Sequence, residues 1–506
     1  MGAVLAIDQG TTSVRATLLE ADGQGILRTL SAAAETIPRS FPRPGWVEID
    51  AELVVAATER VTHKAMERSG IRASDVLALG FTNQGETVVA WDRATGKPLA
   101  PAIGWQCRRT EEACARLRED AALVSRIRNA TGLPIDPYFS ATKIAWLLDH
   151  VPDGRARAAR GEILVGTFDS YTLFRLSAGA LFATDPSTAC RTLLAGLDDG
   201  RFSQELCDTF RVPTGVLAEV VSSDVAGVDA RISVGGLTLP LRAMLCDQPS
   251  AMLGTGCAAE GDVKCTYGTG AFLQVHTGAN HAVADDGLLR SIAWELSGAR
   301  TYLLEGGVLT AGDVLTWLVD DLGLIARPDA LDDLLATTPD SAGVAFLPAL
   351  SGLGAPHWVG EARGTVLGLH RGVTRAHLVR AALEGVAHEV ADIVEAAARA
   401  LGRPLAPMWA DGGLAASTEF LELQADLIGM PLRRAPRAEA TTHGVAAIAA
   451  VATGLSPSIE QALRADPQPK VLPTLDAAAR HEQRARHARL VAVATSRAVL
   501  DLHRGA

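Results

Sequence analysis

The chain has 506 residues, more than one hydrophobic core normally serves, so the length predicts two domains. With 48% hydrophobic and 21% charged residues, the composition excludes an intrinsically disordered chain. The net charge of −11, without a basic patch, argues against nucleic acid as a partner. Only five basic residues are lysines and the G-x-x-x-x-G-K-[ST] loop is absent, so phosphate would be held by backbone N–H groups, hydroxyls, arginine or metal.

Cysteine content and the beginning of the chain bear on the compartment. Seven cysteines without a C-x-x-C pair predict reduced, buried thiols rather than a disulfide scaffold or structural zinc. The N-terminus lacks the basic segment of a secretion signal, and the longest run of small apolar residues, 444–455, is too short to span a bilayer. We therefore expect a cytoplasmic protein with no membrane partner.

The N-terminal region begins with predicted strands. Apolar runs at 4–7 and 14–19 flank a Gly-Thr turn, and a third strand follows near 26–30. Asp50 is a natural N-cap for a helix over 51–68, because its side chain can accept hydrogen bonds from the first turn. A strand at 76–81 then ends on polar residues. This order predicts an α/β domain whose sheet begins as an antiparallel meander.

A second hairpin of the same design occurs later. Strands at 263–267 and 271–276 flank the turn Gly268-Thr269-Gly270, and Thr269 follows Thr11 by 258 residues, close to half the chain. This spacing predicts two related lobes, residues 1–250 and 251–506, with both Gly-Thr turns facing a common cleft. The later predicted elements are a helix at 377–401, a strand at 408–410 leading into Asp411-Gly412-Gly413, and a solvated helix at 480–506.

The segment from Asp8 to Arg15 has the composition of a nucleotide-phosphate site. Gly10 allows the backbone to approach an anion, Thr11 and Thr12 supply hydroxyl groups, and Arg15 can neutralise phosphate charge. Asp8, at a strand end, could hold Mg²⁺ through water.

Glycine-rich segments of this kind admit other interpretations. For 8–15 alone, a plain β-turn rich in Gly and Thr explains the composition almost equally well. Its recurrence at 267–270, together with 411–413, favours a phosphate, a metal and a purine held between two lobes. The segment 254–259 matches G-x-G-x-x-A, but no full strand precedes it and no acidic residue follows at the required distance. We therefore reject a dinucleotide-binding fold.

Motifs along nearly the whole chain are similar to those of one enzyme family. Together they resemble the FGGY carbohydrate kinases, and most closely the members that phosphorylate glycerol. The similar segments are 8–15, 82–87, 105–109, 136–140, 247–248 and 267–272, with the longer stretches 138–150, 364–369 and 377–384. The resemblance implies an α/β fold of two actin-like ATPase lobes, also described as ribonuclease-H-like, around a central cleft that binds ATP and substrate.

The resemblance also implies roles for individual residues. Asp247 would be the general base that accepts the proton of the acceptor hydroxyl. The polyol would be bound by Glu86, Tyr138, Asp247 and Gln248 through its hydroxyls and by Trp105 and Phe272 through its carbon face. The phosphates of ATP or ADP would meet Thr11, Thr12, Ser13, Arg15 and Thr269, with Mg²⁺ near Asp8. Adenosine would lie against Gly312, Thr316, Gly413 and Ser417.

The chain departs from the family at several positions. Gly85 replaces the arginine that the glycerol-phosphorylating members carry before Glu86, which removes a donor to the substrate hydroxyls and opens room beside them. Thr316 and Ser417 stand where glutamine and asparagine are usual, and both keep a hydroxyl. The segment 234–239 lacks the arginine of the Gly-Gly-x-Arg loop that bacterial glycerol-phosphorylating members carry, so we expect insensitivity to fructose 1,6-bisphosphate.

Three functions are compatible with these motifs. The first is ATP-dependent phosphorylation of a terminal hydroxyl of glycerol to give glycerol 3-phosphate. The second is the same transfer to a larger polyol, a tetritol or pentitol, because of Gly85. The third is a non-catalytic actin-like ATPase switch, against which the predicted polyol pocket argues. The family often forms dimers or tetramers, which predicts a homo-oligomer.

Overall fold

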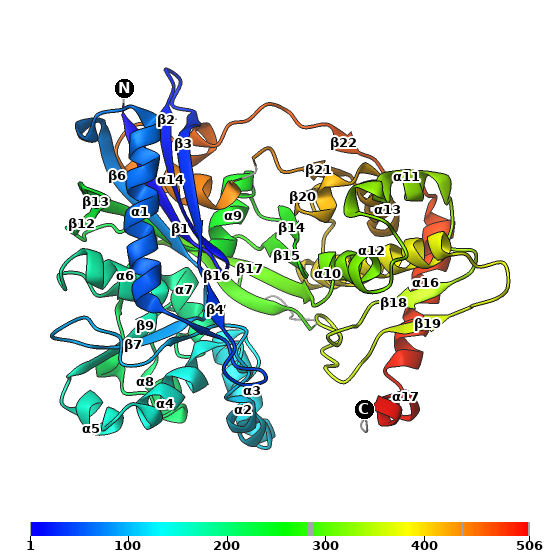
Figure 1. The fold of residues 1–506 in the computed structure, drawn as a ribbon, viewed down its shortest axis with the longest axis horizontal. Helices are drawn as coiled ribbons and strands as arrows, with labels where there is room; N and C mark the ends of the chain where they lie inside the picture. Colours follow the sequence, from blue (N-terminus) through cyan, green and yellow to red (C-terminus); the bar gives the residue numbers. More distant parts are fainter. Residues whose placement is uncertain (1, 282–286, 438, 504–506) are drawn as a thin grey trace.

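The computed structural model describes residues 2–281, 287–437 and 439–503, and it consists of two α/β lobes side by side (Figure 1). Most of the N-terminal half, drawn in blue to green, forms the lobe at the left, and most of the C-terminal half forms the lobe at the right. The two largest sheets have six and seven strands, one in each lobe.

The six-stranded sheet of the first lobe has its strands in the order β12 (Arg231–Val234), β13 (Leu237–Cys246), β6 (Val76–Asn83), β1 (Ala3–Gln9), β2 (Ser13–Ala21) and β3 (Leu27–Thr36). Strands β1, β2 and β3 are antiparallel neighbours, whereas β1, β6 and β13 run parallel. This confirms the predicted opening meander. It also brings the C-terminal ends of three parallel strands to one edge of the sheet.

The seven-stranded sheet of the second lobe repeats this arrangement. Its strands lie in the order β22 (Lys470–Val471), β21 (Leu432–Arg434), β20 (Met408–Gly412), β14 (Val263–Tyr267), β15 (Ala271–His276), β17 (Ala299–Val308) and β16 (Leu289–Leu296). Strands β14, β15 and β17 are antiparallel neighbours, and β14, β20 and β21 run parallel. The shared order of antiparallel and parallel pairs confirms the two related lobes expected from the spacing of the hairpins.

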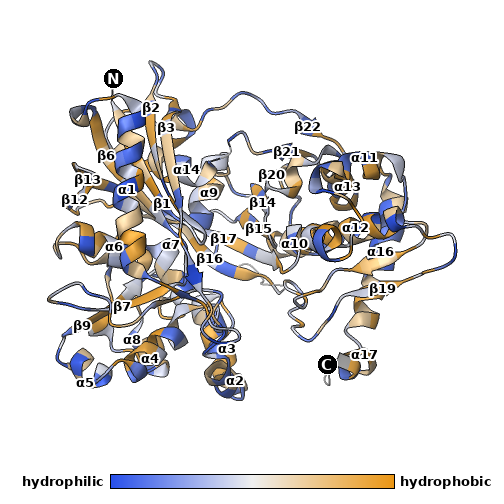
Figure 2. Cartoon of the chain, in the orientation of Figure 1, coloured by the Kyte–Doolittle hydropathy of each residue, from blue (hydrophilic) through white to orange (hydrophobic). Residues whose placement is uncertain are grey.

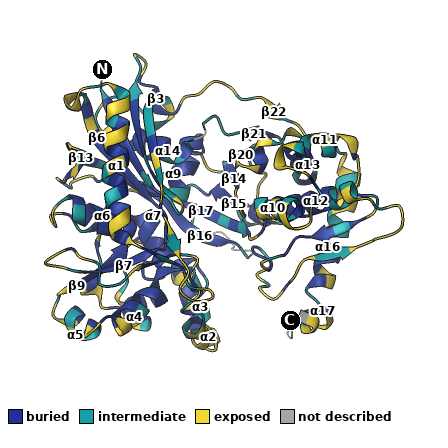
Figure 3. Ribbon diagram, viewed as in Figure 1, coloured by how far each residue is buried: buried dark blue, intermediate teal, exposed yellow. Residues whose placement is uncertain are grey.

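Helix α1 (Ala51–Ser69) packs on β2 and β3 of the first lobe. The Asp50 side chain accepts hydrogen bonds from the backbone N–H groups of Glu52 and Leu53, so the predicted N-cap is confirmed. Gly70 ends the helix with φ +68°, a conformation that glycine adopts without strain. The outward residues of α1 are largely hydrophilic in Figure 2 and exposed in Figure 3, whereas the strands behind it are buried.

Helices α9 (Asp247–Thr255) and α14 (Ala440–Ala452) pack against each other, so a segment of the second half lies on the first lobe's sheet (Figure 1). A Cβ on Gly254 would lie 1.8 Å from the carbonyl oxygen of Ala440, and one on Gly444 would lie 1.9 Å from that of Ser250. The helix contact therefore requires glycine at both positions. It explains the G-x-G-x-x-A match at 254–259 as packing.

A smaller sheet adjoins the first lobe. Its order is β4 (Arg39–Ser40), β5 (Glu48–Ile49), β8 (Ala102–Ile103), β7 (Val88–Asp92) and β9 (Ile163–Thr167). The other elements before β12 include α2 (Glu111–Arg118), α3 (Ala121–Thr131), α4 (Ser140–His150), α5 (Gly154–Ala159), α6 (Phe168–Leu176), β10 (Ala183–Thr184), α7 (Pro186–Ala189), the 3₁₀ turn η2 (Cys190–Thr192), α8 (Gln204–Thr209) and β11 (Glu219–Val220). Those after β17 include α10 (Gly312–Thr316), α11 (Leu331–Thr337), β18 (Ala345–Leu347), β19 (Thr365–Leu367), α12 (Arg375–Leu401), η6 (Leu414–Ala416), α13 (Thr418–Ile428), α15 (Ile459–Ala462), α16 (Ala477–Ala494) and α17 (Arg497–His503).

Helix α16 corrects the expectation of a solvated C-terminal helix. Leu490 and Val491 are buried, and the guanidinium of Arg484 pairs with Asp392 and Glu395 of α12. The many Arg and His residues of this segment predicted a solvent-exposed helix, so the sequence did not indicate the contact. Arginine stems can lie along apolar surface while their charged groups find partners.

All seven cysteines are buried and free, as predicted. Within the described part of the chain, no helix is long and apolar enough to cross a membrane. Among the same residues, no cluster of three or more His, Cys, Asp or Glu side chains is arranged to hold a metal ion.

Candidate active site

Three acidic residues lie where parallel strands of the first lobe end. Asp8 is next to the last residue of β1, Glu86 follows the end of β6, and Asp247 begins α9 directly after β13. In α/β sheets, ligands bind outside the C-terminal ends of such strands. The sheet thus gathers three carboxylates that are far apart in the sequence.

Two of these carboxyl groups titrate near neutrality. Burial raises the pKa of Asp247 to about 7, the charge of Glu86 adds to this shift, and the Gln248 N–H group, 2.7 Å from Oδ1, opposes it. Burial and the charge of Asp247 raise the pKa of Asp8 to about 7 as well. Oδ1 of Asp8 is buried without a hydrogen-bond partner. The site is short of positive charge and suits a cation or a proton donor.

Glu86 is fixed by contacts to both its backbone and its side chain. Nε of Arg191 donates to Oε1 of Glu86 at 2.6 Å, and the hydroxyl of Ser140 donates to the Glu86 carbonyl at 3.1 Å. Burial raises the pKa of Glu86, while Arg191 and Lys143 oppose the shift. Glu86 has φ +60°, a left-handed conformation that costs a non-glycine residue on the order of 1 kcal/mol and is often found at functional sites.

Trp105 and Tyr138 form one aromatic wall near Glu86. Their ring centroids are 5.4 Å apart at an interplanar angle of 74°. The indole N–H of Trp105 donates to Oγ1 of Thr11 at 3.0 Å, which joins the predicted polyol wall to the predicted phosphate turn. Phe272, also predicted for the wall, lies on β15 with 36% of its surface exposed. Among the described residues, no ring contact joins Phe272 to the other two.

Gln248 follows Asp247 in the first turn of α9, as the motif requires. Its Oε1 is buried and has no hydrogen-bond partner. A buried acceptor of this kind costs about 1–3 kcal/mol unless a ligand hydroxyl or water satisfies it.

Position 85 faces protein atoms. A Cβ on Gly85 would lie 3.0 Å from Sγ of Cys246 and 3.8 Å from Cγ of Arg191. The first atoms of any side chain here would therefore run beside Cys246 and the stem of Arg191. Part of the room that the sequence predicted beside Glu86 is already filled.

The phosphate turn of the first lobe is closed by a hydrogen bond from the Gly10 N–H to the Ser13 carbonyl at 3.0 Å. Thr12 is exposed and Ser13 is half-buried. Arg15, opposite Asp8 in the β1–β2 register, is ion-paired with Glu439, which directly precedes α14. The predicted phosphate arginine thus meets a carboxylate of the second half of the chain.

The turn of the second lobe docks on the start of α10. The N–H of Gly312 donates to the Gly268 carbonyl at 2.9 Å, and the N–H of Ala311 donates to the Thr269 carbonyl at 2.8 Å. A Cβ on Gly312 would lie 2.5 Å from that Gly268 oxygen, so glycine is needed here. Thr269 and Thr316 are both exposed.

The predicted adenosine residues Gly413 and Ser417 flank η6. Gly412, with φ +88° and a Cβ position 2.3 Å from a carbonyl oxygen of β14, has the stronger requirement for glycine. Ser417 caps α13 by accepting from the Phe420 N–H at 3.0 Å, and its hydroxyl donates to Asp332. The Ser417 hydroxyl therefore has a structural role in this fold.

Two lysines near the site were not assigned a role from the sequence. Lys143 is fully buried; burial lowers its pKa to about 7, and its Nζ donates to the Tyr138 carbonyl at 2.8 Å. Lys264 is also buried and pairs with Asp411 at 3.2 Å between β14 and β20. Lysine is rare in this chain, and both residues lie within apolar segments of the sequence. That position was the signal that could have marked them as buried lysines.

Arg191 is a further residue without a role predicted from the sequence. It lies in η2, 6% exposed, and joins Glu86 to Glu305 of β17 with a second contact of 3.1 Å. Its guanidinium also lies over the Tyr138 and Phe139 rings, 5.4 and 5.3 Å from their centroids. No sequence pattern predicts these contacts, because the partners come from three distant segments.

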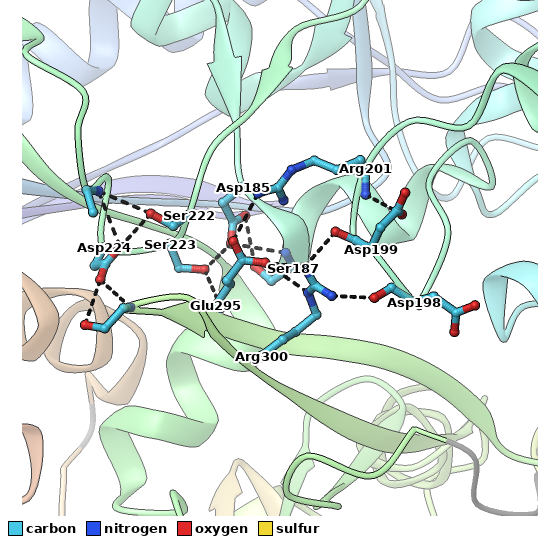
Figure 4. A network of polar contacts seen from close by, with 12 residues as sticks. Asp185, Ser187, Asp198, Asp199, Arg201, Ser222, Ser223, Asp224, Glu295 and Arg300 are labelled. Carbon is cyan, nitrogen blue, oxygen red and sulfur yellow. Dashed lines mark hydrogen bonds and ion pairs between the residues drawn. The ribbon is translucent and has the colours of Figure 1, made fainter.

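The buried carboxylate of Asp185 belongs to a polar network (Figure 4) that supports the end of β13, directly before Asp247. Asp185 accepts hydrogen bonds from the hydroxyls of Ser187 and Ser223, each at 2.8 Å. The Ser187 hydroxyl in turn accepts from the Cys246 N–H at 2.8 Å. Asp185 thereby fixes the backbone immediately before Asp247.

The same network fastens the β16–β17 hairpin to the first lobe. The Ser223 N–H donates to the Glu295 carbonyl at 2.9 Å, and the Glu295 N–H donates to the Ser223 hydroxyl at 3.1 Å. The Glu295 carboxylate pairs with Arg201 and Arg300 (Figure 4). The β16–β17 hairpin thus contacts the network that supports the backbone before Asp247.

Known proteins match this chain along its length. Residues 3–254 match the N-terminal domain of the FGGY family of carbohydrate kinases, and residues 263–453 match its C-terminal domain. A glycerol kinase of Aromatoleum aromaticum is 45% identical over 462 residues, 91% of this chain and 92% of the relative. The crystal structure of Plasmodium falciparum glycerol kinase with ADP has a TM-score of 0.91 at 28% identity, covering 98% of this chain and 99% of that one. Xylulose kinase of Rhodospirillum rubrum shares the fold, with a TM-score of 0.83 at 23% identity over 97% and 98% of the chains.

The duplicated lobes, with three carboxylates at the strand ends of the first lobe, define a phosphotransferase with the actin-like ATPase fold, as the sequence motifs implied. The chain belongs to the FGGY family of carbohydrate kinases. It is an ATP-dependent carbohydrate kinase, and this membership disfavours the non-catalytic switch.

Proposed function

We propose that this kinase transfers the γ-phosphoryl group of ATP to a terminal hydroxyl of glycerol, giving glycerol 3-phosphate and ADP. The observation that carries the proposal is the grouping of Glu86, Asp247 and the unpartnered Gln248 Oε1 beside the Trp105–Tyr138 wall. Such a site offers several acceptors and one aromatic face to a small polyol. Relatives named glycerol kinase, 40–45% identical over more than nine-tenths of the chain, support glycerol over a larger polyol.

Asp247 would act as the general base. With a pKa of about 7, a substantial share of this carboxyl group is ionised at neutral pH and can accept the hydroxyl proton. The substrate oxygen then bonds to the γ-phosphorus, the bond from that phosphorus to the β–γ bridging oxygen breaks, and ADP leaves. Phosphoryl transfer depends mainly on positioning and charge stabilisation, so a weak base is sufficient.

Substrate hydroxyls would be recognised by acceptors that the protein leaves available. Glu86 has one oxygen engaged by Arg191, and Gln248 has a buried oxygen with no partner. Hydrogen bonds to glycerol would recover the free energy that these buried groups lose on desolvation. Trp105 and, from the second lobe, Phe272 would cover the carbon face of the substrate.

The residues present fit a hydrated Mg²⁺ next to ATP. Asp8 has a raised pKa and a buried oxygen without a partner, and proteins usually hold Mg²⁺ through one or two carboxylates together with waters and phosphates. When bound, the ion neutralises phosphate charge. The hydroxyls of Thr12, Ser13 and Thr269 would position the phosphates of the nucleotide, with Arg15 as the nearby cation.

The location and assembly of the protein belong to the same proposal. Seven buried free thiols favour a reducing compartment such as the cytoplasm. The tendency of the family to form dimers or tetramers supports a homo-oligomer.

ADP formation measured with and without glycerol tests the proposal. We expect ADP to form rapidly only when both glycerol and Mg²⁺ are present, in a one-to-one ratio with a product that phosphorus NMR identifies as glycerol 3-phosphate. ADP formation at one rate regardless of any polyol would contradict a polyol kinase and support the ATPase switch.

A further inference from the structure

Arg191 connects the substrate region of the first lobe to the second lobe. Nε bonds to Glu86, whereas Nη1 bonds to Ser291 at 2.8 Å and to Glu305 at 3.1 Å. Ser291 and Glu305 lie on the β16–β17 hairpin. One buried guanidinium therefore links the predicted polyol carboxylate to the hairpin.

The side chain of Arg191 also lies next to position 85, which is glycine in this chain. The Arg191 Cγ is 3.8 Å and its Cβ is 4.0 Å from the point at which a Cβ of residue 85 would lie. Gly85 thus contributes no side chain here, and the stem of Arg191 borders the space.

Without Arg191, the carboxylates of Glu86 and Glu305 would repel each other. The charge of Glu305 already raises the pKa of Glu86, and Arg191 acts against that shift. Both carboxylates are mostly buried, so water compensates little for a lost guanidinium. Glu86 would then have to turn away from the orientation in which its free oxygen can meet a substrate.

We infer that Arg191 is a positioning residue for polyol recognition: it holds Glu86 and packs against the Tyr138 ring in the orientation that meets the substrate hydroxyls, beside a position 85 that carries no arginine. This inference rests on the proposed function. On this inference, the contact that Arg191 makes between the two lobes determines which arrangement of substrate hydroxyls the site accepts.

A double-mutant cycle between Arg191 and Glu86 tests the inference. In Arg191→Met, the KM for glycerol should rise about 10- to 100-fold, and kcat should change less than about 5-fold. The preference for glycerol over propane-1,3-diol should fall by a similar factor. Because Arg191 acts through Glu86, adding Arg191→Met to Glu86→Gln should change kcat/KM by less than about 3-fold.

Arg300→Met is the matched control. Arg300 fastens the same hairpin to the first lobe through the carbonyls of Asp198 and Asp199, each at 2.6 Å (Figure 4). It should lower the melting temperature but leave the KM for glycerol within about 2-fold. Arg191→Lys keeps the charge but cannot form the forked contact, so an intermediate KM is expected, and this variant decides the question if Arg191→Met does not fold.

Two results would overturn the inference. One is a KM for glycerol that stays at the wild-type value in both Arg191 variants, or that rises equally in Arg300→Met. The other is a double variant whose loss of kcat/KM equals the product of the losses in the Arg191 and Glu86 single variants. If the wild-type enzyme phosphorylates no polyol, the proposed function fails instead, and this is seen before any variant is made.

Discussion

Asp8, Asp247 and Lys143 all have a pKa near 7, although their ordinary values differ widely. Burial is the main cause in each case, because removal from water disfavours the charged form of acids and bases alike. Titratable groups shifted in this way are typical of functional sites. The shared cause explains why carboxyl and ammonium groups at one site approach neutrality from opposite directions.

Replacing Asp247 with asparagine should remove the proton acceptor while preserving size. We expect kcat to fall by about 10²–10⁴-fold, the usual contribution of a general base. ATP affinity, measured by calorimetry, should change less than about 3-fold. Asp262→Asn is the control, because Asp262 is a partly buried carboxyl that instead accepts from the Ala259 N–H. Turnover by Asp247→Asn at the wild-type rate would remove Asp247 from the mechanism.

The raised pKa of Asp247 also predicts the pH dependence of the enzyme. Below a pH of about 7 the group is mostly protonated and cannot accept a proton, so kcat/KM should rise with pH and level off above about 8. The charged groups around it are Asp8, Glu86 and Arg191, with the Cys246 thiol adjacent. A profile of kcat/KM against pH measures this limb, and a flat profile between about 5.5 and 8 would contradict the assignment.

The pKa of Lys143 is also about 7, so a mutation is needed to show which of the two groups causes the fall in kcat/KM at low pH. In Lys143→Met the acid limb of the pH profile should persist, because Asp247 still carries the proton-accepting group. If kcat/KM of this variant no longer fell at low pH while kcat was unchanged, the acid limb would belong to Lys143 and not to Asp247.

At the scale of elements, sequence patterns located regular strands and helices well. The hairpin at 263–267 and 271–276 has the predicted limits, and α12 begins two residues before the predicted start at 377. Alternating or helical apolar spacing and a Gly-Thr turn were sufficient there. The small five-stranded sheet was not predicted, because three of its strands have only two residues and carry no periodicity.

The crossing of α9 and α14 gives a prediction about stability. Gly444→Ala places a Cβ 1.9 Å from the Ser250 carbonyl oxygen, so the helices must separate and lose packed surface. We expect the melting temperature to fall by several degrees, corresponding to about 2–4 kcal/mol. Gly215→Ala is the control, since its Cβ would meet nothing within 4 Å. Equal melting temperatures for the two variants would show that the crossing tolerates a methyl group.

The turn between β12 and β13 bears on regulation. Gly235 and Gly236 have φ +57° and +83°, and the Gly235 N–H donates to the Glu59 carboxylate. A carboxylate that occupies this N–H disfavours a sugar bisphosphate, and no arginine stands in 234–239 to attract one. Fructose 1,6-bisphosphate should leave the initial rate unchanged. Saturable inhibition in the ADP assay would contradict this.

At the scale of the whole molecule, the repeated Gly-Thr hairpin was enough to predict duplication of the lobes. Motifs also predicted Glu86, Asp247 and Gln248 as substrate-binding residues, and the fold places all three at one sheet edge. The residues that support them, such as Arg191 and Asp185, could not be assigned roles. Their partners lie on separate segments, so only the tertiary structure shows what each charge contacts.

The same distinction applies to Gly85. The sequence shows a missing arginine, which suggests a larger substrate pocket. The structure shows that Cys246 and Arg191 border that position, so the loss of one side chain does not by itself create space for a longer polyol. Specificity therefore depends on how the neighbouring elements fill the site.

The central claim is that glycerol is the acceptor, and a kinetic panel tests it most directly. The kcat/KM values of glycerol, erythritol, threitol, ribitol and xylitol are measured with saturating ATP and Mg²⁺. We expect glycerol to exceed every longer polyol by at least about 10-fold, because an unpaired or displaced hydroxyl in a small polar site costs on the order of 1–3 kcal/mol. A tetritol or pentitol with a higher kcat/KM than glycerol would contradict the account.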